Sequence, residues 1–338
     1  MRSFSYGRAD SVQSAVKDIA GNQAAPDAAN ATVKLVAGGT NLLDLMKADV
    51  MRPVRLVDIT RLPLKTIEET AEGGLRLGAL MTNADTAYDE RVQARYPMLS
   101  KAILAGASAQ LRNMATNGGN LLQRTRCYYF YDTATPCNKR EPGSGCGALH
   151  GVNRIHAILG VSEHCIAVHP SDMAVALAAL DATVRVTGPG GERAIPIGEF
   201  HRLPGDTPHI DTTLRADEII TGIELPAQGF AAHSTYLKAR DRASYAFALI
   251  SAAVALELDG GTIREARLAL GGVAHKPWRD RAAEAALAGQ PATRDSFRAM
   301  ADAVLRDAKG YEHNSFKIDL ARSVILRAFE EAAGLEPS

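Results

Sequence analysis

The sequence has no excess of charge of either sign. It carries 38 Lys and Arg residues against 38 Asp and Glu residues, so its formal net charge is zero. Proteins that bind nucleic acids or anionic membrane surfaces normally show a basic excess, and we therefore expect neither kind of partner. Long apolar runs are also lacking, because none approaches the roughly 18 residues that a membrane-spanning helix needs.

The first twenty residues lack the marks of a secretory signal peptide. The stretch MRSFSYGRADSVQSAVKDIA has no continuous apolar core and no cleavage site after small residues. We therefore expect a chain made in the cytoplasm. It would be periplasmic only if it were exported together with a partner that carries a signal, and cytoplasmic otherwise.

Cysteine is scarce, and its placement is unusual. The 338 residues contain four cysteines, all between positions 127 and 165, with gaps of 9, 8 and 18 residues. The C-x₂₋₄-C pairs typical of structural zinc sites are absent, and so is the C-x-x-C motif of thioredoxin-type proteins. Disulfides are unusual in chains without a signal peptide. An iron–sulfur cluster accepts four thiolates on loops, so the open readings are a cluster, a zinc site, disulfides or four unrelated buried thiols.

The overall composition and the residue patterns indicate a globular chain of two or three domains. Hydrophobic residues make up 46% and charged residues 22%, which is ordinary for a soluble fold. Residues 1–58 read as a small α/β unit and 59–228 as strands and helices that contain the cysteine segment, 124–168. After the link LPAQGFAA, residues 232–338 predict long antiparallel strands around Asp259-Gly260-Gly261, then helices over 280–308 and 315–335, an α+β pattern.

Two glycine pairs are candidate anion sites. In KLVAGGTNLLDLM a strand, a Gly-Gly turn and a helix follow one another, which exposes backbone N–H groups to a phosphate. The stretch ATNGGNLLQRT repeats the arrangement. Neither is the G-x-G-x-x-G fingerprint, and a purely structural turn would look similar. Ser171 and Asp172 open a further helix, where ordinary N-capping is the alternative to a ligand contact; the neighbouring histidines are typical of ordinary surface or core positions.

The order of these motifs resembles a known family. KLVAGGTNLLDLMK, GASAQLRNMATNGGNLLQRTRC, HPSDMAVAL, DEIITGIELP and LALGGVAHKPWR occur as in the FAD-binding subunit of molybdenum hydroxylases, the group of xanthine dehydrogenase, carbon monoxide dehydrogenase and aldehyde oxidoreductases. The cysteine segment, with NLLQRTRC, PCNKR and PGSGC, is most similar to that of the flavoprotein subunits of bacterial periplasmic aldehyde oxidoreductases.

The resemblance implies a fold and a set of binding residues. The fold would be a two-part FAD-binding domain of the vanillyl-alcohol-oxidase/PCMH type (1–228), followed by an α+β C-terminal domain of the CO dehydrogenase flavoprotein type. The four cysteines would ligate a [4Fe–4S] cluster: Cys127, Cys137, Cys146 and Cys165. The residues implied for FAD are Lys34, Leu35, Val36, Ala37, Gly38, Gly39, Thr40, Asn41, Leu42, Thr116, Gly119, Asn120, Asp172, Ile220 and Lys238.

The implied activity is electron transfer within a heterotrimeric oxidoreductase. A large molybdopterin-binding subunit would hydroxylate the substrate, and a small subunit with two [2Fe–2S] centres would pass electrons to this chain and then to an external acceptor. We accordingly predict no catalytic residue for aldehyde chemistry here. The alternatives are a subunit of a 4-hydroxybenzoyl-CoA reductase-like or xanthine dehydrogenase-like enzyme, a stand-alone flavoenzyme of the vanillyl-alcohol-oxidase type, and a non-redox binding module with structural cysteines.

Overall fold

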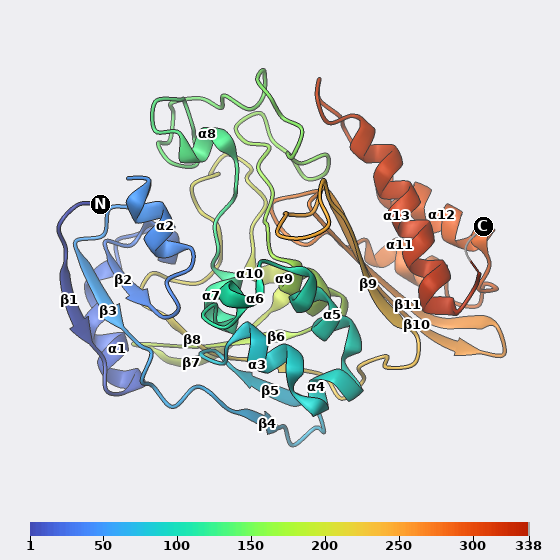
Figure 1. Cartoon of the computed structure of the whole chain (residues 1–338), viewed down its shortest axis with the longest axis horizontal. Coiled ribbons are helices and arrows are strands. Elements are labelled where there is room, and N and C mark those ends of the chain that lie inside the picture. Colours follow the sequence, from blue (N-terminus) through green and yellow to red (C-terminus); the bar gives the residue numbers. More distant parts are fainter. Residues whose placement is uncertain (337–338) are drawn as a thin grey trace.

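The computed structural model describes residues 1–336 and contains three separate β-sheets (Figure 1). The first is a parallel sheet near the N-terminus in the order β1-β3-β2. A side-chain cap from Ser11 starts its first helix, which packs three apolar side chains toward this sheet. The elements of this unit are β1 (Ser5–Arg8), α1 (Val12–Ile19), η1 (Ala20–Asn22), η2 (Ala28–Asn30), β2 (Val33–Val36), α2 (Leu42–Lys47) and β3 (Arg55–Asp58).

The second sheet has five antiparallel strands in the order β4-β5-β8-β6-β7. Strand β6 alternates half-buried and buried residues, as expected when one face of a sheet is covered by helices. Its elements are β4 (Ile67–Glu69), β5 (Leu75–Gly78), α3 (Asn83–Tyr88), α4 (Glu90–Arg95), α5 (Pro97–Ala105), α6 (Ala109–Arg112), α7 (Asn117–Leu121), α9 (Asp172–Ala179), β6 (Thr183–Gly188), β7 (Gly191–Pro196), α10 (Ile197–Phe200) and β8 (Ile219–Leu225).

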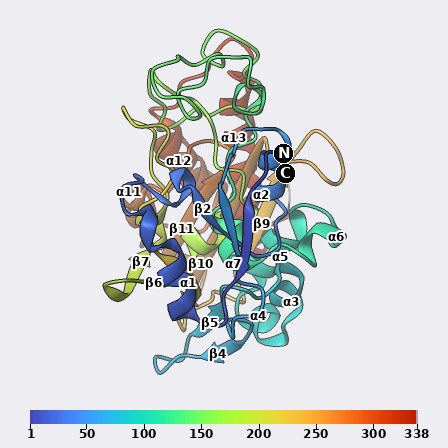
Figure 2. The same cartoon turned by 90° about the vertical axis from the view of Figure 1, so that its left-hand side faces the viewer.

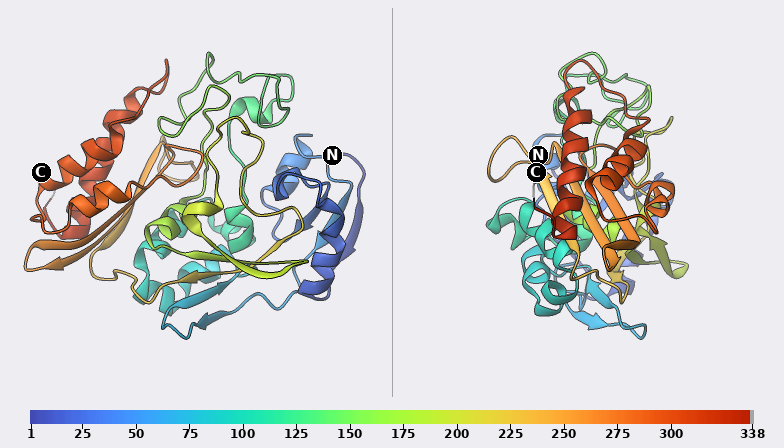
Figure 3. Two further views of the ribbon diagram at one scale, coloured as in Figure 1. Left: turned by 180° about the vertical axis from the view of Figure 1, so that it is seen from behind. Right: turned by 90° about the vertical axis from the view of Figure 1, so that its right-hand side faces the viewer.

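The third sheet forms the C-terminal domain. Its antiparallel strands run β11-β10-β9, with α12 and α13 over one face, while α5 and α9 of the preceding domain contact the other face (Figure 3). Burial on both faces explains why residues 250–256 are continuously apolar or small. The elements are β9 (Ser234–Ala239), β10 (Ile250–Asp259), β11 (Thr262–Gly271), α11 (Arg281–Ala286), α12 (Arg294–Leu305) and α13 (Phe316–Ala333).

These elements confirm the mixed fold expected from the sequence. The helical stretch predicted over 280–308 is divided into α11 and α12, because residues 287–293 form a turn in which Pro291 bridges to Thr262. Pro lacks a backbone N–H and interrupts a helix. Among residues 1–336 no helix is both long and apolar enough to cross a membrane.

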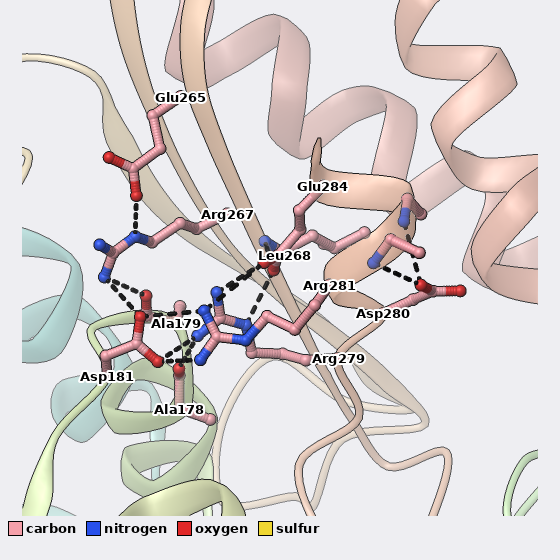
Figure 4. A network of polar contacts seen from close by, with 12 residues as sticks. Ala178, Ala179, Asp181, Glu265, Arg267, Leu268, Arg279, Asp280, Arg281 and Glu284 are labelled. Atoms are coloured by element: carbon pink, nitrogen blue, oxygen red, sulfur yellow. Dashed lines mark hydrogen bonds and ion pairs between the residues drawn. The ribbon is translucent and has the colours of Figure 1, made fainter. Parts of the chain in front are cut away.

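A cluster of ion pairs joins the C-terminal domain to α9 (Figure 4). Asp181, just after α9, receives Arg279 at 2.8 Å and Arg267 at 3.0 Å, and it also pairs with Arg281. Arg279 also pairs with Glu284, with its Nη2 lying 2.6 Å from Glu284 Oε2. Because Arg267 and Arg279 are largely buried, these pairs fix the position of the third sheet against the helix that begins at the candidate site.

The cysteine segment is built mostly of turns. Between α7 and α9 the only regular helix in the described chain is the short α8 (Tyr128–Tyr131), and the loops project away from the three sheets (Figures 1 and 2). Their core consists of Phe130, Ile166, Ala167 and the cysteines themselves, together with Leu45 of α2. Both ends of the segment return to the helices that carry the second glycine pair and Asp172.

Candidate functional site

The two glycine turns lie against each other. A Cβ atom on Gly38 would sit 1.8 Å from the carbonyl oxygen of Met114, so only glycine allows this contact between the first turn and the chain that leads into the second. Gly39 has φ = +71°, which glycine adopts at little cost. The two turns, far apart in the sequence, therefore form one continuous backbone surface.

Backbone donors of the first turn are free. Within residues 1–336, no hydrogen bond uses the N–H groups of Gly39, Thr40 or Asn41 as donors. The side chain of Asn41 is partly committed, since its Oδ1 accepts from the N–H of Arg124 at 2.9 Å while its buried Nδ2 has no partner in the described chain. Unpaired N–H groups in a concave turn favour an anionic ligand.

The second turn is held by side-chain hydrogen bonds. Thr116 caps α7 by accepting from the N–H of Gly119 at 3.2 Å. Asn120 donates to Oδ1 of Asn83 at 2.7 Å and accepts from the hydroxyl of Ser171 at 2.5 Å. The last bond links this turn to the start of α9, where Asp172 lies.

Asp172 and Lys238 form a buried ion pair. Lys238 Nζ lies 2.8 Å from Asp172 Oδ2, and the two side chains are 4% and 8% exposed. Asp172 Oδ1 accepts from the hydroxyl of Tyr236 at 2.5 Å, and burial raises the pKa of that phenol well above its usual value, so it stays a donor. The sequence analysis did not predict Tyr236 as a site residue. It lies two residues before Lys238 in strand β9, so the two side chains share one face of the strand.

One large cavity collects the predicted FAD residues. It has a volume of about 740 Å³ and is lined by every one of them except Lys238, which lies behind Asp172. Ile220 reaches the wall from β8 and packs beside Gly118. This volume is within the usual range for cofactor pockets, about 300–1,000 Å³. Four separate segments that contain predicted FAD residues thus contribute to a single pocket.

The cavity wall also contains a buried charge cluster that the sequence did not reveal. Asp211 accepts from Arg124 Nε at 2.7 Å and pairs with Lys139, whose side chain is only 3% exposed. Burial raises the pKa of the Asp211 carboxyl, but the two cations outweigh it and hold that pKa well below the usual range. Burial, and then the nearby Arg124 charge, lowers the pKa of Lys34 to about 7.

Two buried histidines and a half-buried one complete this part of the wall. His169 and His201 stack with ring centroids 4.0 Å apart, and His275 lies on the same cavity. Burial lowers the pKa of His201 to about 4 and the pKa values of His169 and His275 well below 6.5, so all three are neutral near pH 7. The sequence predicts an ordinary surface or core position for His169, and nothing in the local sequence indicates that His201 and His275 lie beside it.

The four cysteines meet at a second, much smaller cavity. Cys127, Cys137, Cys146 and Cys165 all line it, and its volume is about 10 Å³, the space of about one water molecule. All four are free thiols. In residues 1–336 no three His, Cys, Asp or Glu side chains are already placed to hold a single metal ion.

The thiols have perturbed acidities. A hydrogen bond from Cys165 lowers the pKa of Cys146 to about 6, and the same bond raises the pKa of Cys165 well above its usual value. Burial raises the pKa of Cys127 to about 12. Each thiol would lose its proton to a bound metal, because metal coordination deprotonates thiols outright.

His156 contacts one of these thiols. Its Nε2 lies 3.1 Å from Cys127 Sγ, and its ring is 1% exposed. Burial lowers the pKa of this histidine to about 4, so it carries one proton near neutrality. Toward a Cys127 thiolate, which can only accept a hydrogen bond, the proton of the neutral ring would lie at Nε2. Lys317 Nζ, from α13, fixes the segment by donating to the His156 carbonyl at 2.7 Å.

Comparisons with known proteins give two family matches. A model described as the FAD binding domain in molybdopterin dehydrogenase matches residues 2–228, and one described as the CO dehydrogenase flavoprotein C-terminal domain matches residues 234–332. The chain is 50% identical to the aldehyde oxidoreductase FAD-binding subunit PaoB of Escherichia coli K12 over 333 residues, covering 98% of this chain and 99% of that one.

More distant relatives have the same extent. The glyceraldehyde dehydrogenase medium chain of Sulfolobus acidocaldarius is 26% identical, with 98% of both chains covered. Among solved structures, a carbon monoxide dehydrogenase from Hydrogenophaga pseudoflava, which lacks the Mo-pyranopterin moiety of its cofactor, superposes with a TM-score of 0.76 at 27% identity. That alignment covers 98% of each chain.

Proposed function

Because this chain belongs to the FAD-binding medium subunits of molybdenum hydroxylases, we propose that it is the FAD- and [4Fe–4S]-carrying electron-transfer subunit of a molybdenum-dependent aldehyde oxidoreductase. The observation that carries the proposal is the single cavity of about 740 Å³ onto which both glycine turns open. The 50% identity to an aldehyde oxidoreductase subunit supports the aldehyde enzyme over a xanthine dehydrogenase-like or 4-hydroxybenzoyl-CoA reductase-like one.

The residues of the cavity suit FAD. The free N–H groups of Gly39, Thr40 and Asn41 would bind the diphosphate, while Thr116, Gly119 and Asn120 close the cavity from the second turn. Asp172, with its orientation fixed by Tyr236 and Lys238, presents a carboxylate to donors of the cofactor. When bound, FAD takes up electrons singly and releases them singly or in pairs. The chain's own contribution is to bind it, orient it and set its electrostatic surroundings.

The cysteine cavity suits a [4Fe–4S] cluster in its donor chemistry. Four thiols from three loops face one space, which is the Cys₄ set that such clusters require. Coordination would leave each of the four sulfurs as a thiolate. His156 Nε2 then donates to the Cys127 thiolate. No two of the four cysteines are joined in a disulfide.

The partners follow from the proposed role. Electrons would reach the chain from a small subunit with two [2Fe–2S] centres, after substrate oxidation on a large molybdopterin-binding subunit, and would leave to an external acceptor. We propose a periplasmic location if a partner carries the export signal. A stand-alone flavoenzyme is the competing function, and it would require turnover by this chain without partners.

The test is cofactor analysis of the anaerobically purified complex. We expect one FAD per chain and iron and acid-labile sulfide in excess of what the small subunit holds, with flavin bleaching when an aldehyde is added. Absence of FAD would refute the flavin role, and absence of the additional iron would refute the cluster alone. A Cys137→Ser variant that assembles with unchanged turnover would refute an obligatory relay through the cluster, while failed assembly would assign the cluster a structural role.

A further inference from the structure

Arg124 is a buried cationic side chain with an unpaired hydrogen-bond donor. Its backbone N–H is bound to Asn41 of the first glycine turn, and its Nε donates to Asp211. The guanidinium also lies over the ring of Phe130, with Cζ 4.7 Å from the ring centroid. Its Nη2 is buried, lacks any hydrogen-bond partner in residues 1–336, and belongs to a side chain that lines the large cavity.

A free guanidinium donor of this kind requires an acceptor. Buried polar groups in native proteins are almost always hydrogen-bonded, and an unpaired charged one is costly. Asp211 and the Phe130 ring hold the Arg124 side chain in place, and the bond to Asn41 holds its backbone. The acceptor is therefore supplied by what fills the cavity.

The charge of the cavity wall indicates which part of the ligand supplies the acceptor for Arg124. Seven lining side chains are basic and only four are carboxylates: Lys34, Lys47, Arg112, Arg124, Arg126, Lys139 and Arg202 against Asp44, Asp172, Asp211 and Glu218. The carboxylates are already paired with cations of the chain. FAD carries its negative charge on the diphosphate, which is also the group that a planar guanidinium binds best.

We propose that Arg124 is a further FAD-binding residue that donates to the diphosphate, and that Asp211 and Lys139 hold its guanidinium in the binding orientation. This goes beyond the fifteen residues that the family resemblance implied, and it rests on the proposed FAD function. Asp211 takes up one side of the guanidinium through Nε, which leaves Nη1 and Nη2 without a hydrogen-bond partner among residues 1–336 on a side chain that lines the cavity.

The arrangement gives the cysteine segment a role in flavin binding. Arg124 precedes Cys127 by three residues, and Lys139 follows Cys137 by two. Thr125 and Lys139 are the two residues that line both the FAD cavity and the cysteine cavity. The position of Arg124 in the FAD cavity therefore depends on the conformation of the cysteine segment.

The experiment compares two flavins. In the assembled complex, stripped of flavin, the dissociation constants of FAD and of riboflavin are measured by flavin fluorescence for wild type and Arg124→Met. Riboflavin lacks the diphosphate. We expect FAD to bind about 10- to 100-fold more weakly in the variant, as for a lost charge-assisted hydrogen bond, with riboflavin unchanged. Arg61→Met, at an exposed arginine, is the matched control and should change neither value.

Unchanged FAD affinity in Arg124→Met would overturn the inference, and so would an equal loss of affinity for both flavins, which would mean a structural role only. If the Met variant does not assemble, Arg124→Gln, which keeps a donor for Asp211, is judged by the same two outcomes. A wild-type complex without FAD would instead contradict the proposed function itself, so the two failures are distinguishable.

Discussion

Substituting alanine for Gly38 tests whether the contact between the two glycine turns builds the FAD site. The new Cβ would meet the Met114 carbonyl oxygen at 1.8 Å and its carbon at 2.6 Å, and both atoms are backbone. No side-chain rotation relieves such a clash, so the turns must separate. Overpacking of this kind costs about 1–3 kcal/mol or more, and we expect the FAD affinity to fall by about 10- to 100-fold.

A graded series makes the reasoning quantitative. Gly118 has room for a Cβ at 3.3 Å from Ala79, a contact that a small shift accommodates, so Gly118→Ala should cost roughly 1 kcal/mol or less. Gly21 has nothing within 4 Å of the added atom and does not need a positive φ, so Gly21→Ala should be neutral or stabilising by up to about 1 kcal/mol.

The assays are FAD titration of the deflavinated complex and thermal unfolding of each variant. The expected order of damage is Gly38, then Gly118, then Gly21, in both measurements. Wild-type FAD affinity in Gly38→Ala, with an unchanged melting temperature, would show that the two turns do not need their close contact and would refute the argument.

Three other perturbations test separate parts of the structure. His156→Leu removes the donor to Cys127 and should make the potential of the proposed cluster more negative, by about 59 mV if the reduced form loses tenfold stabilisation; an unchanged potential by EPR titration would contradict the hydrogen bond. His201 titrates near pH 4 when folded and near 6.5 when unfolded. Because the unfolded chain then binds more protons, the free energy of unfolding should fall as pH drops from 6.5 to 4, by about 3 kcal/mol from this group, and His201→Asn should flatten that slope in denaturant titrations. Asp181→Asn keeps the backbone conformation but removes the charge opposite Arg279, which should cost about 2 kcal/mol of stability, and an unchanged urea midpoint would show that the domain interface does not depend on it.

Local patterns in the sequence predicted the elements that carry the turns. A β-branched strand followed by Gly38-Gly39 and an amphipathic stretch corresponds to β2, the turn and α2, and the Asp259-Gly260-Gly261 turn joins β10 and β11. Family resemblance added Asp172, Ile220 and Lys238, whose own local patterns do not distinguish a ligand contact from capping or packing. The single interruption of the predicted helix at 280–308 depends on a bridge to a distant strand.

The two glycine turns, the capped start of α9 and the concentration of thiols can be identified from the local sequence, because each depends on neighbours within a few residues. Three contacts become visible once the chain is folded: Asp211 pairs with Arg124 and Lys139, His201 stacks on His169, and Lys238 pairs with Asp172 without lining the cavity. Those partners are separated by 32 to 87 residues. Periodicity and capping report on a single helix or strand, whereas the pairing of buried charges is set by which loops pack together once the three sheets are in place.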